Sequence, residues 1–476
     1  MKMRSCSRRQ FLQAAGVGLA ATTLGSAARA AGANTPRVNF VFILIDDMGW
    51  ADLSCYGSTY HQSPIIDRLA GQGMRFTDAY AACPVCSPTR ASILTGKYPA
   101  RLGVTDFIPG HWRPWARLVV PEIHNQLPLT ETTIPEALKS AGYVSACFGK
   151  WHLGWGRQFG PGANGFDVHG TGGSRGDKQV TGLTDKALKF MADHRDRPFF
   201  LFLSHHTVHI RLEAPGKLVA KHTARLKPGQ KHPAQANPTY AAMIEHLDNS
   251  VGRVLDKLDE LKLADRTVVI FFSDNGGLIK IYTGAGEIVT SNLPLRSEKG
   301  TLYEGGIRVP LIVRWPGVVK AGSVSNVPVT STDFFPTMLE AAGVKRPAGA
   351  SPDGLSLLPI LTGRGRLKRD AIYWHYPHYH HTAPCGAMRE GRHKLIEFYE
   401  DGRLELYDLE VDLGEENDLA ARMPEKAAEL RRKLHAWRRS VGAAMPTQNA
   451  NHDPAKAHQW GRRPRPKPKP AARKKG

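Results

Sequence analysis

The chain has 476 residues, 41% hydrophobic and 22% charged, which is enough apolar sequence for one large folded domain and a smaller one. Its formal net charge of +21 is concentrated at the ends: residues 1–30 contribute five positive charges, and residues 452–476 contribute a net eight. The modest surplus between them argues against nucleic-acid binding and favours an anionic substrate.

The first 30 residues have the features of a twin-arginine signal peptide. Arg8 and Arg9 precede a mildly apolar stretch, and residues 28–30 form a small-residue cleavage site before Ala31. The stretch is too short to span a membrane, and no other segment reaches that length. The sequence therefore predicts a soluble protein that the twin-arginine machinery exports to the periplasm or the medium, with no transmembrane segment.

Residues 37–365 alternate between buried strands and amphipathic helices, a pattern typical of an α/β sheet covered by helices on both faces. We interpret residues 37–365 as the main domain. In chain order we expect a strand at 38–45, helices at 64–70 and 134–140, a strand at 143–148, a helix opening at Thr184, a strand at 198–203, a helix at 238–261, strands at 268–272 and 308–313, and a helix at 332–342.

The pattern changes after residue 365. Short strands expected at 371–374, 394–398 and 403–407 precede a helix at 424–439, which predicts a smaller C-terminal α+β domain over 366–440 with a short antiparallel sheet. Residues 441–476 form a basic tail rich in proline and lysine. We expect this tail to be disordered, either solvated or resting on an acidic surface or polyanion.

Cys86 opens the run Cys-Ser-Pro-Thr-Arg at residues 86–90. Ser87 is a favourable helix N-cap and Pro88 a favourable first helical residue, so Cys86 is expected where free N–H groups and the helix dipole favour negative charge. Such a position binds oxyanions, and Arg90 can hold a tetrahedral anion or orient a modified side chain. Taken alone, the run also fits a structural cysteine, half a disulfide, a reactive thiol or a redox pair with Cys83.

Two pairs of oxygen ligands follow predicted strands. Asp46 and Asp47 come after the strand at 38–45, and Asp274 and Asn275 after the strand at 268–272. Because the carboxyl ends of parallel strands meet at one edge of a sheet, we expect the pairs to lie together. Oxygen donors suit Ca²⁺ or Mg²⁺ rather than zinc or copper. One Asp-Asp pair by itself would more often be a helix cap or a turn.

The chain resembles the formylglycine-dependent sulfatases of the alkaline phosphatase superfamily over about residues 37–440. Three runs carry the resemblance: Cys86-Ser87-Pro88-Thr89-Arg90, Gly96-Lys97-Tyr98-Pro99-Ala100-Arg101 and Ser273-Asp274-Asn275-Gly276-Gly277. The resemblance implies an alkaline phosphatase-like fold, in which a large mixed, mostly parallel sheet is sandwiched by helices. It also implies a sulfuric ester hydrolase, whose substrate we expect to be a sulfated carbohydrate.

The same resemblance implies a cofactor and a partner. A sulfatase-maturing enzyme would oxidise Cys86 to 3-oxoalanine (formylglycine), and one Ca²⁺ ion would bind the metal set Asp46, Asp47, Cys86, Asp274 and Asn275. The implied catalytic set comprises Cys86, Arg90, Lys150, His152, His209 and Lys299. His206 is the alternative to His209, because the proline that usually follows this histidine closely in the family is replaced here by Ile210-Arg211.

Several alternatives stay open at this level. A phosphatase or phosphodiesterase of the same superfamily shares the tetrahedral substrate geometry, and an inactive homologue would bind sulfated glycans with the same pocket. One or two disulfides are possible among Cys55, Cys83, Cys147 and Cys385. The run at 375–381, rich in histidine and tyrosine, fits either a sugar subsite or a plain loop.

Overall fold

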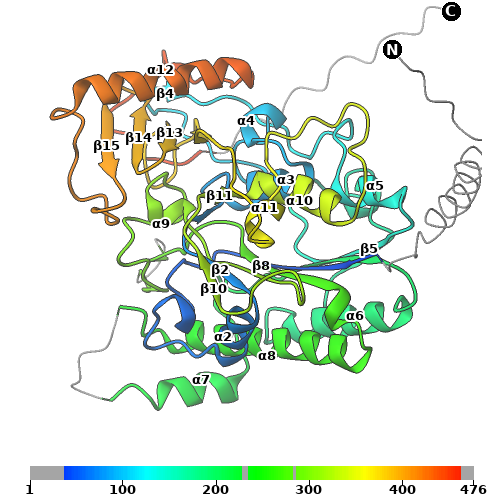
Figure 1. Ribbon diagram of the computed structural model, residues 1–476. Coiled ribbons are helices and arrows are strands. Elements are labelled where there is room, and N and C mark those ends of the chain that lie inside the picture. Colours follow the sequence, from blue (N-terminus) through cyan, green and yellow to red (C-terminus); the bar gives the residue numbers. More distant parts are fainter. Residues whose placement is uncertain (1–36, 228–233, 282–285, 462–476) are drawn as a thin grey trace, which may run out of the picture. The chain divides into compact units, whose positions relative to one another are not determined.

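The structure is a computed structural model that describes residues 37–227, 234–281 and 286–461 (Figure 1). The predicted signal peptide and residues 462–476 of the predicted tail lie outside the described residues. Within the described part of the chain, the largest sheet has eight strands. Their order is β10 (Ser323–Ser325), β2 (Met74–Phe76), β9 (Leu311–Arg314), β8 (Thr267–Ser273), β1 (Asn39–Ile45), β7 (Phe199–Ser204), β5 (Val144–Gly149) and β6 (Val168–Gly170).

This sheet is mixed and mostly parallel, as predicted. The central strand β1 runs parallel to β7 and β8, and β5 runs parallel to β7 and β6. The exception is β9, which is antiparallel to both β8 and β2. The strand expected at 308–313 starts later, at Leu311, and Arg308 lies outside it, where its side chain donates to the Thr77 carbonyl and to Asp78.

Alternation along β1 explains why the sheet needs helices on both faces. Phe40, Phe42 and Leu44 belong to one apolar cluster, whereas Val41 and Ile43 belong to the other. Helices lie on both sides of the sheet in Figure 1. The first face is covered by α3 (Cys86–Thr95), α5 (Ile134–Lys139), α10 (Phe334–Ala341) and α11 (Leu358–Leu361), and the second by α2 (Pro64–Gln72), α6 (Val180–Asp193) and α8 (Pro238–Glu260).

Helix boundaries follow local capping. Helix α8 starts as expected at Pro238, because the Asn237 side chain accepts the N–H groups of Thr239 and Tyr240. Helix α6 starts at Val180 and not at Thr184, so the predicted start was wrong. Thr184 is internal to the helix, where its hydroxyl donates to the Val180 carbonyl at 2.6 Å.

Shorter elements complete the main domain. The helices are α4 (Pro99–Leu102), α7 (Gly216–Thr223) and α9 (Glu304–Ile307), and the small strands are β3 (Ala79–Tyr80), β4 (Leu118–Val119) and β11 (Val329–Thr330). Single 3₁₀ turns occur at Ser54–Tyr56, Pro161–Asn164, Ala264–Arg266 and Ser331–Asp333. None of the helices in the described ranges combines the length and the apolar composition needed to cross a bilayer.

The predicted antiparallel sheet is present, with one strand more than expected. It consists of β12 (Ile372–Tyr376), β13 (Cys385–Glu390), β14 (His393–Phe398) and β15 (Leu404–Asp408), and helix α12 (Pro424–Ser440) covers one face. The sequence did not indicate β13, because its first residues, Cys385, Gly386 and Ala387, are small and do not alternate between apolar and polar side chains. Gly386 leaves room there for the Tyr399 hydroxyl, which would lie 2.2 Å from an added Cβ.

The second sheet shares a core with the main domain. Trp374 and Ile396 from this sheet pack in one apolar cluster with Tyr80, Leu302 and Ile307. Consistent with this shared core, the described residues from Val38 onward belong to one compact unit. All five cysteines that the structure describes are free thiols, so none of the possible disulfides forms among them.

Part of the predicted disordered tail is ordered, which corrects the boundary placed at residue 441. Strand β16 (Thr447–Gln448) pairs with β4, and the Asn449 side chain donates to the carbonyls of Pro114 and Ala116. Further on, the Gly461 N–H donates to the Trp112 carbonyl at 3.0 Å. We call residues 447–461 the C-terminal strap. Tertiary hydrogen bonds hold it, and these are invisible to a prediction based on composition.

A buried charge cluster joins the second sheet to the main domain. Lys394 of β14 lies 2.8 Å from both Glu304 and Glu415, and all three side chains are fully buried. Burial and then the neighbouring Glu304 carboxylate raise the pKa of Glu415 to about 7, against the effect of Lys394. Glu304 also accepts hydrogen bonds from Tyr80 and Arg308, so it stays ionised.

Replacing Lys394 by methionine tests the importance of this cluster. We expect K394M to lower the free energy of unfolding by about 3–5 kcal/mol, because two buried carboxylates lose their shared cation. The matched control is K433M, since Lys433 pairs with Glu390 and Glu429 on the surface and should contribute far less. Urea denaturation measures both variants, and equal losses would contradict the prediction.

Candidate active site

The predicted site residues meet at the carboxyl edge of the large sheet. Asp46 and Asp47 follow β1, Lys150 and His152 follow β5, and Asp274 and Asn275 follow β8. Backbone hydrogen bonds continue past the strand ends, from Asp46 N–H to the Thr207 carbonyl and from Asp274 N–H to the Ile45 carbonyl. These bonds fix the loops that carry the ligands, as expected for the edge of a parallel sheet.

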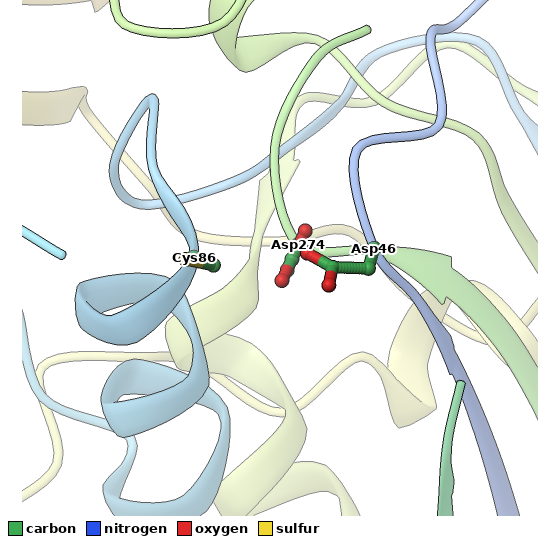
Figure 2. Close-up of side chains that lie close together, drawn as sticks. All are labelled: Asp46, Cys86 and Asp274. Atoms are coloured by element: carbon green, nitrogen blue, oxygen red, sulfur yellow. The ribbon is translucent and has the colours of Figure 1, made fainter. Parts of the chain in front are cut away.

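Cys86 lies at the start of helix α3, which is buried along its whole length. The helix begins at Cys86 itself with Val85 as its N-cap, so the expected cap at Ser87 was wrong. The Ser87 hydroxyl instead accepts the Ile108 N–H at 3.1 Å. Figure 2 shows the side chains of Cys86, Asp46 and Asp274 facing one another, with their ligand atoms all within 4.8 Å.

Each of the three buried carboxylates of the site has a cation of its own. Arg90 donates twice to Asp274, at 2.7 and 2.8 Å. Lys150 donates to Asp46 at 2.6 Å, and Lys299 donates to Asp47 at 2.7 Å. The three positive and three negative charges therefore balance within the site, which is the condition for burying them.

The pKa values report where negative charge is crowded. Burial would raise the pKa of Asp46, but Lys150 and the other nearby cations hold it well below its usual value. Burial and then the Asp46 carboxylate raise the pKa of Asp274 to about 6, against the effect of Arg90. Asp46 and Asp274 thus repel each other across a gap that a further cation would relieve.

Unfilled oxygen acceptors line the same gap. Asp46 Oδ1 and Asn275 Oδ1 are buried and accept no hydrogen bond from the described residues. Asn275 donates its amide N–H to Asp47 at 2.8 Å, which leaves its carbonyl oxygen available to a ligand. Carboxylate and amide oxygens without donors are the ligands that a hard divalent cation prefers, so the residues present fit Ca²⁺ or Mg²⁺.

His152 faces the Cys86 thiol. Its Nε2 lies 2.7 Å from the Ile108 carbonyl, which can only accept, so Nε2 carries the proton. Its Nδ1 is then an acceptor 3.2 Å from the Cys86 sulfur. Burial and then Lys150 lower the pKa of His152 to about 4, so the imidazole is neutral and ready to take a proton.

A pocket of about 420 Å³ opens above this set. His206 and His209 both line it, and His209 Nε2 lies 3.6 Å from Asp47. Burial lowers the pKa of both imidazoles. The lining comprises Asp46, Phe107, Ile108, Lys150, His152, Lys178, His206, His209 and Ile210.

Sequence reasoning missed two polar residues of the site. Ser204 accepts a 2.6 Å hydrogen bond from Arg90, and a polar residue ending an apolar strand is a signal that could have found it. Lys178 lines the pocket from a loop, and no motif marks it. Most of the run at 375–381 is buried, since Tyr376 donates to Asp106 and His378 contacts Thr105.

Two family models match the chain. The model described as Sulfatase matches residues 38–344, and the one described as N-sulphoglucosamine sulphohydrolase, C-terminal, matches residues 297–440. The chain belongs to the sulfatase family. A sulfatase of Formosa agariphila is 32% identical over 84% of this chain and 88% of its own length. Human N-acetylgalactosamine-6-sulfatase is 33% identical over 73% and 69%.

A solved structure, that of Ps i-CgsB, is 26% identical to this sulfatase with a TM-score of 0.73, covering 87% of this chain and 94% of the other. The family confirms the predicted enzyme class, the hydrolysis of sulfate esters, and the alkaline phosphatase-like fold. Within this sulfatase, the structure brings together the predicted site residues Asp46, Asp47, Cys86, Arg90, Lys150, His152, His209, Asp274, Asn275 and Lys299.

Proposed function

We propose that this sulfatase removes sulfate from a sulfated sugar, with Cys86 oxidised to formylglycine and with a bound Ca²⁺ ion. The observation that carries the proposal is the Cys86 side chain, which faces two buried carboxylates, Asp46 and Asp274, each paired with a cation. Relatives support the choice of substrate, since one is named N-acetylgalactosamine-6-sulfatase and another was solved in complex with k-i-k-neocarrahexaose.

The Cys86 thiol stands where the modified side chain would be. Hydrated formylglycine supplies one hydroxyl that can attack sulfur and a second whose ionisation lets sulfate leave. His152 Nδ1 faces this position at 3.2 Å and is neutral, so we assign it the acceptance of a proton from residue 86. Asp274 is the acceptor proposed for the attacking hydroxyl.

The Ca²⁺ ion would be held by Asp46, Asp47, Asp274 and Asn275 together with the modified Cys86. When bound, it supplies positive charge next to the sulfate oxygens. Because the protein's own charges cancel three against three, the ion adds a net charge of two. A monoanionic sulfate ester offsets one of these two charges, and a proton that moves from the nucleophile to Asp274 leaves the total unchanged.

Lys150 and Lys299 stabilise charge in this scheme. Burial would lower the pKa of Lys299, but its pairing with Asp47 raises it, so the ammonium stays charged at neutral pH. His209 has a pKa lowered by burial and a half-exposed ring that faces the pocket. Because its ring lines the pocket, we assign to His209, with Lys299 as the alternative, the proton that the departing alcohol oxygen takes. The lowered pKa means that His209 must take up this proton before the ester is cleaved.

An aromatic wall leads from the pocket to the surface and suits a sugar. Phe107 lines the pocket, and the His111 ring packs edge-on against it at 4.3 Å. The ring centroids of Trp460 in the strap and His111 lie 4.6 Å apart. The Arg113 guanidinium lies 4.0 Å from the centroid of the Trp460 ring, and Trp460 is 49% exposed. Trp460 lies beyond the residues that either family model matches.

We also propose that the protein is exported by the twin-arginine machinery to the periplasm or the medium. The support is the sequence of residues 1–30, with Arg8 and Arg9 ahead of an apolar stretch and Ala31 after the cleavage site. A peptide mass spectrum of exported protein tests this proposal and the Cys86 modification together.

We expect that spectrum to show Ala31 as the first residue and a Cys86 peptide lighter than the thiol form. The variant C86S should lose turnover by roughly three orders of magnitude or more, because serine lacks the second hydroxyl. C86S should also retain sulfate covalently bound to residue 86. Unmodified thiol in active protein, or full multiple turnover in C86S, would contradict the mechanism.

Removing the metal should abolish activity. We expect EGTA to lower kcat/KM by about two orders of magnitude and added Ca²⁺ to restore it. Independently of activity, Ca²⁺ at a hundred times its Kd should raise the free energy of unfolding by about 2.7 kcal/mol. D46N should lose this stabilisation, whereas D193N, at an exposed carboxylate of α6, should keep it. Unchanged activity after exhaustive chelation would refute the metal site.

The substrate proposal is tested with a panel of sulfated oligosaccharides and with 4-nitrophenyl sulfate. We expect W460A to raise KM for the preferred oligosaccharide about tenfold, because the indole supplies a rigid contact surface. W460F should recover part of the loss. KM for 4-nitrophenyl sulfate should stay unchanged, since this compound ends inside the pocket. Release of sulfate from the aryl ester and from no sugar would reject the sugar substrate.

A further inference from the structure

Lys178 lines the active-site pocket but has no place in the scheme above. It shares the pocket wall with Lys150, His206 and His209. It comes from the loop between β6 and α6, whereas the other lysines follow β5 or lie in the segment before α9.

Local hydrogen bonds fix the backbone of the loop that carries Lys178. Lys178 and Gln179 both adopt left-handed backbone conformations, with φ of 52° and 63°. Such conformations cost free energy for residues with a Cβ and persist where surrounding contacts fix them. Asp177 accepts the N–H groups of Gln179 and Thr181, and the Gln179 side chain accepts the Gly172 N–H at 2.9 Å.

The charge of Lys178 is not cancelled by a carboxylate in contact with it. The site cations Arg90, Lys150 and Lys299 each have a carboxylate within 2.7 Å. Over residues 37–227, 234–281 and 286–461, no hydrogen bond or ion pair engages the Lys178 ammonium. Two carboxylates, Asp46 first and then Glu213, act to raise the pKa of Lys178, and both do so from beyond ion-pair distance.

An unfilled hydrogen-bonding atom lies in the same wall. His206 Nε2 is buried and has no partner among the described residues. Lys178 lies near enough to His206 to contribute to the lowering of its pKa. One uncompensated cation and one imidazole with an unfilled nitrogen thus belong to the wall of the same pocket, apart from the three paired cations.

We propose that Lys178 is a substrate-binding residue that holds an anionic oxygen of the substrate beside His206. The inference rests on the hydrolysis of sulfate esters and not on the proposed sugar. The oxygen belongs either to the reacting sulfate or to a second anionic group on the molecule that carries it. A sulfate monoester carries a negative charge, so an uncompensated cation in the pocket wall attracts it.

The first experiment uses the mature enzyme with 4-nitrophenyl sulfate as substrate and inorganic sulfate as competitive inhibitor. If Lys178 holds the reacting sulfate, K178M should raise the Ki of sulfate about tenfold, the loss expected for one charged hydrogen bond. K178R should stay within about threefold of the wild type. The matched control is K262M, because Lys262 is also left-handed, with φ of 57°, but lies after α8 away from the pocket.

The second experiment separates the two sources of the anion. N-acetylgalactosamine 6-sulfate and the 4,6-disulfate are compared as inhibitors of 4-nitrophenyl sulfate hydrolysis. If Lys178 holds a second anionic group, K178M should leave the Ki of inorganic sulfate unchanged but lose about tenfold in affinity for the disulfate alone. Neither readout requires the enzyme to hydrolyse a sugar, so the proposed substrate can fail while the role of Lys178 stands.

Folding is controlled by a second neutral variant. K178N also removes the charge, and asparagine tolerates a left-handed backbone, so it replaces K178M if methionine prevents folding. Unchanged Ki values for inorganic sulfate and for both sugar sulfates in a folded neutral variant would overturn the proposal. An equal loss in K262M would do the same, because it would trace the effect to general charge and not to position.

Discussion

The pairing of three buried carboxylates with three buried cations is the constraint on which the site depends. Asp46, Asp47 and Asp274 lie within a few ångströms of one another in a place with almost no solvent. Each would be too costly to bury alone, so each is held by one cation. The pairs join β1, β8, α3 and the loop after β5, and they therefore tie the chemistry to the sheet.

That constraint explains the surrounding architecture. Arg90 reaches Asp274 because helix α3 is buried along its whole length, and its remaining donors end on Ser204 and the Lys150 carbonyl. A similar arrangement occurs at Lys394, where one buried cation pairs with two buried carboxylates and connects the second sheet to the main domain. Balanced buried charge thus joins elements that apolar packing alone would position less uniquely.

Site residues that directly follow strands or lie in family motifs were predictable, and Lys178 and Trp460 were not. Asp46 and Asp274 follow apolar runs whose length and composition indicate buried parallel strands, so their meeting at one edge follows from sheet geometry. Lys178 and Trp460 carry no such signal. Lys178 lies in a loop whose left-handed backbone is fixed by hydrogen bonds to Asp177. Trp460 belongs to the strap, which is held by backbone hydrogen bonds to residues more than three hundred positions earlier.

By itself, the sequence determined an α/β sheet covered by helices on both faces, the ligand pairs at its edge and a helix start next to Cys86, because strand periodicity and local motifs act over short distances. The tertiary structure decided which cation pairs with which carboxylate, and it left Asp46 Oδ1 and Asn275 Oδ1 without partners. It also brought Lys178 to the pocket wall and Trp460 of the strap against His111. These outcomes depend on contacts between residues far apart in the chain, and no local pattern encodes them.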